Sequence, residues 1–192
     1  MPNISAHLIV AKEIGKKLNL NNDDFIRGNL LPDVIDEKDS HQKFKKGVYM
    51  VPNINLCLKK LDLNNDMDIG YLIHLLLDKH FLEDYLGTLY PNKNIFSDGK
   101  IYEDYDYLNY KLVTEFNLDL DYLNRILCTY NCKILGKKLL YNIECINQKK
   151  VGNIKYLNFE SFSMFLSEIS DFIIKELINY ANESSKLRLY IR

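Results

Sequence analysis

The pair with the clearest capacity for metal chemistry in this chain is His74 and Asp78. The two residues are four positions apart, so on a helix they lie on one face and can point at the same ion. Imidazole nitrogen and carboxylate oxygen are both ligands that zinc and related metals accept. The flanking residues 72–73 and 75–77 are apolar and predict a buried helix, in which an unpartnered aspartate is costly. By itself, however, such a pair is a weak signal, because an exposed or mutually hydrogen-bonded pair is the more common arrangement.

Three further residues are candidates only in combination with that pair. His7 lies early in an expected helix, where a buried or capping role is the usual explanation for a histidine. Asp33 follows Pro32 in an expected loop, where aspartate commonly forms turns. His41 follows Ser40 at an expected helix start, where it can simply be exposed. None of the three indicates a site alone, and their order along the chain is what gives them meaning.

The elements that must position these residues are predicted from hydrophobic periodicity, which is helical almost throughout. Ser5 is expected to cap a first helix that ends near residues 19–24, and Pro32 favours a loop over residues 29–36. Further helices are expected from near residues 39–40, from Pro52 to about 61, and over about 67–86, 100–116, 119–129, 131–147 and 158–182, with a loop at 87–99. The sequence therefore predicts an all-α fold, a bundle of about seven to eight helices in a single domain spanning residues 1–192.

The composition excludes some classes of protein. The net charge of −1 and the hydrophobic fraction of 47% give no general attraction to nucleic acid or to an anionic membrane, although a local basic patch is compatible with them. No apolar run is long enough for a transmembrane segment, and the N-terminus lacks the pattern of a signal peptide. The four cysteines form no metal-type CxxC pair, so we expect reduced thiols in a cytoplasmic protein.

The ordered candidates resemble the bacterial zinc-dependent phospholipases C. Residues 5–14 (SAHLIVAKEI) are similar to that family's first-helix histidine segment. Pro32-Asp33 followed by Ser40-His41 is similar to the family's next segment, and residues 70–78 (GYLIHLLLD) are similar to its HxxxD helix. The match covers about the first 80 residues, with a looser echo to about residue 110, and the fungal single-strand nucleases share the general plan.

The resemblance implies an all-helical fold with a zinc cluster that hydrolyses phosphoesters. By this match, His41, His74 and Asp78 hold one metal, and His7 and Asp78 share a second, with Asp78 bridging. Asp33 either ligates a metal or orients an attacking water as the general base. One or two zinc ions are expected, and other divalent transition metals are compatible with the same ligands.

The chain departs from the family pattern in its later part. Asp84 stands where the family has a histidine six residues beyond the HxxxD aspartate, and Gly99 precedes Glu103 where the family has an HxxxE pair. A third metal site is therefore lost or rebuilt from carboxylates such as Asp84, Glu103, Asp104 or Asp106, which can equally form a solvated helix face. His80, about 200° round the helix from Asp78, is expected not to be a ligand.

The N-terminus also departs from that pattern. The family uses an N-terminal tryptophan as a ligand, whereas this chain has none. Removal of the initiator before Pro2 places a free amine close to His7 in the sequence.

The expected function is thus metal-dependent phosphoester, in particular phosphodiester, hydrolysis by a metal-activated water on a small-molecule or lipid substrate. There is no specific nucleic-acid signal and no obvious apolar membrane-docking segment. One alternative is a helical phosphohydrolase built around an adjacent His-Asp pair, but no histidine here is followed by aspartate. The other is a non-catalytic helical binding protein with a structural metal or none, in which the fourteen tyrosines line a groove or fill the core edge.

Overall fold

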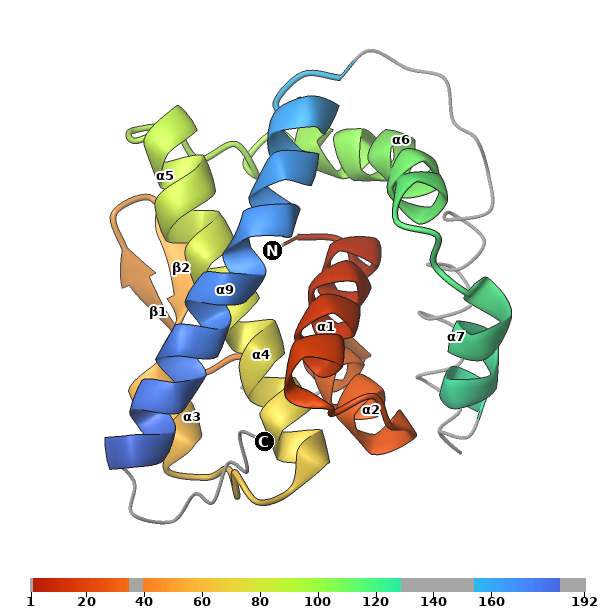
Figure 1. The fold of residues 1–192 in the computed structure, drawn as a ribbon. Coiled ribbons are helices and arrows are strands. Elements are labelled where there is room, and N and C mark those ends of the chain that lie inside the picture. Colours follow the sequence, from red (N-terminus) through yellow and green to blue (C-terminus); the bar gives the residue numbers. More distant parts are fainter. Residues whose placement is uncertain (1, 35–39, 129–153, 184–192) are drawn as a thin grey trace.

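The computed structural model describes residues 2–34, 40–128 and 154–183, which form a predominantly helical structure as the sequence predicts (Figure 1). The elements in chain order are α1 (Ile4–Leu18), α2 (Asp23–Val34), β1 (Lys43–Lys46), β2 (Tyr49–Pro52), α3 (Ile54–Leu58), α4 (Asp66–His80), the π-helical turn η1 (Phe81–Tyr85), α5 (Leu86–Leu89), α6 (Lys100–Glu115), α7 (Leu120–Cys128) and α9 (Phe159–Glu183). The helix expected over 131–147 lies outside the described residues.

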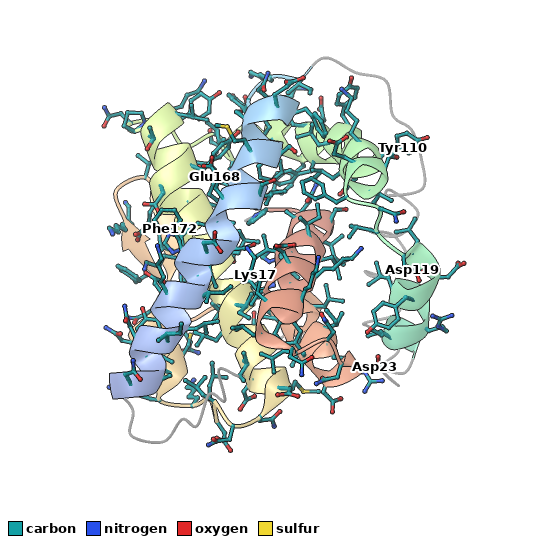
Figure 2. The ribbon with its side chains drawn as sticks, viewed as in Figure 1. Lys17, Asp23, Tyr110, Asp119, Glu168 and Phe172 are labelled. Carbon is teal, nitrogen blue, oxygen red and sulfur yellow. The ribbon has the colours of Figure 1, made fainter. Side chains whose placement is uncertain are left out.

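Helix α4 is the buried axis of the fold. Its side chains from Leu72 to Asp78 are fully buried, as expected for so apolar a run. The helix continues through η1 into α5, so the predicted long helix over 67–86 exists but contains one π-helical turn. The long C-terminal helix α9 runs alongside α1 and α4 (Figure 1). Its residues Phe162, Leu166 and Ile173 enter the core, whereas Phe172 points outward and is 59% exposed (Figure 2).

Helix α1 begins two residues earlier than a Ser5 cap requires. Asn3 has extended backbone geometry and its side-chain oxygen accepts the Ala6 N–H at 2.9 Å, so Asn3 is the cap. Ser5 is instead buried inside the helix, where its hydroxyl donates to Asn109 Oδ1 of α6 at 2.8 Å. The expectation for Ser5 is therefore wrong, and the serine ties α1 to α6.

Helix α2 crosses α4 at very short range. A Cβ at Gly28 would lie 1.8 Å from the Met67 carbonyl oxygen, and a Cβ at Gly70 would lie 2.1 Å from the Phe25 carbonyl oxygen. Only glycine allows this approach, which packs the backbones of the two helices together. The expected loop over residues 29–36 is consequently wrong as far as Val34, because α2 passes through Pro32. Burial of Phe25 and Leu30 on either side of the crossing outweighs the preference of proline to end a helix.

A β-hairpin replaces the helix that the sequence predicts near residues 39–40. After a turn at Ser40 and His41, β1 pairs with β2 in antiparallel register, Lys45 opposite Met50 and Phe44 opposite Val51. Gly47 in the turn has φ +59°, which favours glycine. Pro52 ends β2 rather than opening a helix, and α3 begins at Ile54 with Asn53 as its cap.

Among the described residues, no helix combines the length and the apolar character that crossing a membrane requires.

Candidate metal centre

The five residues singled out in the sequence come together in the interior, from four separate segments. His7 lies in the first turn of α1, Asp33 at the end of α2, His41 in the turn before β1, and His74 and Asp78 one turn apart in α4. His7, His41, His74 and Asp78 are buried, and only the Asp33 side chain has appreciable exposure, at 20%. Two groups of three within this cluster can hold a metal ion: His7, His74 and Asp78, and Asp33, His41 and His74.

The carboxylate of Asp78 divides its two oxygens between different histidines. Its Oδ1 lies 3.4 Å from His7 Nε2, while its Oδ2 lies 3.4 Å from His41 Nε2 and 3.8 Å from His74 Nε2. Asp33 has the same arrangement, with Oδ2 3.9 Å from His7 Nε2 and Oδ1 3.5 Å from His41 Nε2 and 3.8 Å from His74 Nε2. The centre therefore has two halves, one around His41 and His74 and one around His7, joined by both carboxylates.

The protonation state of His74 follows from its hydrogen bond to α2. His74 Nδ1 lies 2.7 Å from the Asn29 carbonyl oxygen, which can only accept, so Nδ1 carries the hydrogen. Burial, together with the neighbouring charge of His7, lowers the pKa of His74 to about 3, so the ring is neutral near pH 7. Its Nε2 therefore presents a lone pair to the centre of the cluster. The close crossing of α2 and α4 is what brings Asn29 to this position.

Asp78 and His7 provide the test of whether a cation fits. Both carboxylate oxygens of Asp78 and both ring nitrogens of His7 are buried without a hydrogen-bond partner. Burial acts to raise the pKa of Asp78, but the adjacent His7 and His74 more than offset it and hold the pKa below its usual range. An ionised, fully buried carboxylate requires a cation or hydrogen-bond donors. A metal ion among nitrogen and oxygen donors meets that requirement, so the residues fit the ligand set that zinc prefers.

Two contacts behind the cluster fix the orientation of His41. Ser40 Oγ lies 2.9 Å from His41 Nδ1, and the Tyr71 hydroxyl donates to the Ser40 carbonyl oxygen. When a histidine binds a metal through one ring nitrogen, a contact to its other ring nitrogen fixes the tautomer and the ring plane. Sequence reasoning did not identify Asn29 or Tyr71 in this role. Asn29 acts through its backbone carbonyl and gives no sequence signal, whereas Tyr71 lies one turn before His74 on α4.

The carboxylates considered for a further metal lie elsewhere. Asp84 is exposed and pairs with His80 Nδ1 at 2.5 Å, and Glu103 is exposed and pairs with Lys100 at 2.7 Å. The structure does not bring either of them to the five-residue cluster. His80 also faces away from the cluster, because its Nε2 lies 3.3 Å from Glu176 of α9.

The Asp104 side chain accepts hydrogen bonds from the segment that precedes α9. Its carboxylate accepts the backbone N–H groups of Lys155, Tyr156 and Leu157, so this aspartate holds the segment before α9 rather than a metal.

Tyr105 of α6 is a buried tyrosine whose ionisation is affected by the charges of the cluster. Burial raises the pKa of Tyr105 well above its usual value, and the negative charges of Asp78 and Asp33 add to the effect. The phenol therefore stays protonated. The sequence places Tyr105 among several tyrosines that line a groove or fill the core edge, without distinguishing it from the others.

Comparison of the chain with protein-family models, with curated proteins and with solved structures finds no match. The geometry of the five-residue cluster is therefore the basis for the function proposed below.

Proposed function

We propose that this protein is a metal-dependent phosphoester hydrolase that binds one or two zinc ions, with phosphodiesters as its principal substrates. The observation that carries the proposal is the position of Asp78, which is fully buried, has no hydrogen-bond partner, and faces histidine nitrogens through both oxygens. Two carboxylates shared between two groups of imidazoles suit a pair of divalent ions.

Each residue has a distinct role in this proposal. His41 and His74, with Asp78 Oδ2 and Asp33 Oδ1, supply one set of donors, and His7 with Asp78 Oδ1 supplies the other. A bound divalent metal supplies Lewis acidity, which lowers the pKa of a coordinated water and neutralises charge on a phosphoryl group. Ser40 and Asn29 keep the His41 and His74 rings oriented for this task.

Asp33 is the group positioned to move a proton. It is the most exposed member of the cluster, so water and substrate reach it most easily. Burial acts to raise its pKa, but His74, His41 and His7 more than offset this and keep the carboxylate ionised. Its Oδ2 has the longest contact to a histidine, 3.9 Å, and is the atom we assign to accept the proton of an attacking water.

The first test is the metal content of the purified full-length protein, together with hydrolysis of bis(p-nitrophenyl) phosphate. We expect one or two tightly held transition-metal ions per chain, lost in His74→Ala and in Asp78→Asn. His80→Gln is the matched control, since this histidine is bonded to Asp84 and Glu176 outside the cluster. A metal-free protein that folds normally and gains no phosphodiesterase activity with added zinc contradicts the proposal.

A non-catalytic protein with a structural metal is the second candidate, and one observation favours it. The half of the centre around His41 and His74 has four protein donor atoms close together, which is enough to complete a tetrahedral shell. Cobalt substitution separates the two functions. Absorption bands that respond to added phosphate indicate an open coordination position and favour the hydrolase, whereas unresponsive bands favour a closed structural site.

A further inference from the structure

The hairpin and α3 carry a concentrated positive charge, although the chain as a whole has a net charge of −1. Residues 40–61 contain five lysines and no aspartate, glutamate or arginine. The five residues are Lys43, Lys45, Lys46, Lys59 and Lys60, and all five are exposed. We refer to residues 43–60 as the basic edge.

The strand geometry gives this edge an outer and an inner face. Tyr49 and Val51 of β2 are buried, so their alternation turns Met50 to the outer face. Lys45 is directly opposite Met50 in the register, and Lys43 is two residues from Lys45 on the same face of β1. Two lysines therefore flank a methionine that is 52% exposed.

Exposed apolar side chains accompany the lysines. Leu56 of α3 is 43% exposed, in addition to Met50. Phe44 of β1 is 42% exposed, but it is opposite Val51 and so lies on the other face of the hairpin. The base of the hairpin is fixed to the start of α3 because the Asn53 N–H donates to the Gln42 carbonyl oxygen. The hairpin and α3 accordingly lie along the same edge of the molecule in Figure 1.

Protection of a sheet edge accounts for only part of this pattern. Lysines on an edge strand discourage pairing with other chains, which explains Lys43 and Lys45. That role explains neither the exposed Phe44, Met50 and Leu56 nor the lysines at the end of α3. Apolar side chains among lysines are instead the combination that binds an anionic lipid surface, where the lysines contact headgroups and the apolar groups enter the interface.

We propose that the basic edge docks the protein on the surface of an anionic lipid bilayer. The exposed Met50 and Leu56 favour a bilayer over nucleic acid, which is bound chiefly through phosphate contacts and aromatic stacking. Lys46 forms an ion pair with Glu83 at 2.8 Å, which reduces the charge of the edge at that point. The docking surface is independent of the proposed hydrolase activity.

The test is co-sedimentation of the full chain with vesicles of phosphatidylcholine alone or with about a third phosphatidylserine. We expect binding to the anionic vesicles only, weakened by high salt. The Lys43→Gln/Lys45→Gln variant is expected to bind at least about tenfold more weakly, and Met50→Ser several-fold more weakly at unchanged charge. The matched control is Lys16→Gln/Lys111→Gln, which removes two exposed lysines from α1 and α6 and should bind as the unaltered protein does.

Three outcomes overturn the proposal. They are no preference for anionic vesicles, an equal loss of binding in the control variant, and binding to a single-stranded oligonucleotide that depends on Lys43 and Lys45 while vesicles are not bound. Circular dichroism of each variant verifies that the hairpin changes leave the fold intact. Because no step uses the metal centre, failure here leaves the hydrolase proposal unaffected.

Discussion

The Nε2 atoms of His41 and His74 face one another at 3.3 Å in the interior of the protein, although the two residues are 33 positions apart in the chain. His74 has its hydrogen on Nδ1, so its Nε2 brings a lone pair to this contact. Without a metal, only a hydrogen on His41 Nε2 can make the contact favourable. With a metal, both nitrogens become ligands, and the same arrangement explains why Asp78 Oδ2 lies beside them.

Added zinc is expected to stabilise the protein through Asp78. A ligand that binds only the folded state stabilises that state by about 2.7 kcal/mol when the ligand concentration is 100 times the Kd. Thermal unfolding of the metal-depleted chain should therefore shift upward with zinc, and Asp78→Asn should abolish most of that shift. Asp66→Asn, at the start of the same helix and outside the five-residue cluster, serves as control and should respond to zinc as the unaltered chain does. An equal zinc shift in Asp78→Asn would remove Asp78 from the ligand set.

Replacement of Asp33 by asparagine should separate catalysis from metal binding. His41, His74 and Asp78 still supply one set of donors, so at least one metal ion should be retained. Loss of the proton acceptor should lower kcat by about 100-fold to 10,000-fold, the usual contribution of general acid–base catalysis. Metal analysis and phosphodiesterase kinetics on the same sample check this. Full activity in Asp33→Asn shows that another group accepts the proton.

Glu176 should contribute stability that disappears in acid. The contact between its Oε2 and His80 Nε2 at 3.3 Å lowers the pKa of Glu176 from about 4.5 to about 2. Burial opposes this effect, and Lys79 reinforces it. A carboxylate with a depressed folded-state pKa stabilises the protein above the unfolded pKa, and this contribution falls as pH drops from about 4.5 towards 2. Since the side chain is only half-buried, we expect ~1–2 kcal/mol rather than the full shift.

Denaturant unfolding of Glu176→Gln at pH 7 and pH 3 measures this contribution. The variant should be less stable than the unaltered protein at pH 7, and the difference should narrow at pH 3. Glu168→Gln is the control, because Glu168 lies on the exposed face of the same helix (Figure 2). A difference that is constant with pH assigns the effect to packing rather than to charge.

Gly28→Ala should disrupt the helix crossing that supports the centre. The new Cβ meets the Met67 backbone, which cannot move aside as a side chain can, so we expect a loss of about 3 kcal/mol or more. Gly87→Ala is the matched helical control, since its nearest neighbour, the Leu82 oxygen, lies at an ordinary 3.4 Å. There the gain in helix propensity should stabilise the fold by about 0.5–1 kcal/mol. Equal stability of the two variants excludes a close α2–α4 crossing.

Local pattern was sufficient to predict α4 and the candidate ligand pair on it. His74 and Asp78 are one turn apart in an apolar run, so their shared face and burial follow from helical geometry alone. The amphipathic α9 was predictable for the same reason, apart from the outward position of Phe172. The hairpin was not, because β1 is short and consists of three exposed lysines and Phe44, without the alternation that marks a strand.

The sequence by itself thus determined that this protein is largely helical and which five side chains are candidate ligands. Only the tertiary structure decided that they meet, because His7, Asp33 and His41 lie on elements whose relative positions depend on long-range packing. The closest of these contacts is set by Gly28 and Gly70, whose missing side chains allow α2 to approach α4. That approach overrides the local preference of Pro32 for a loop and presents the Asn29 carbonyl to His74. Helical periodicity is a local property, whereas the centre depends on how closely two backbones can pack.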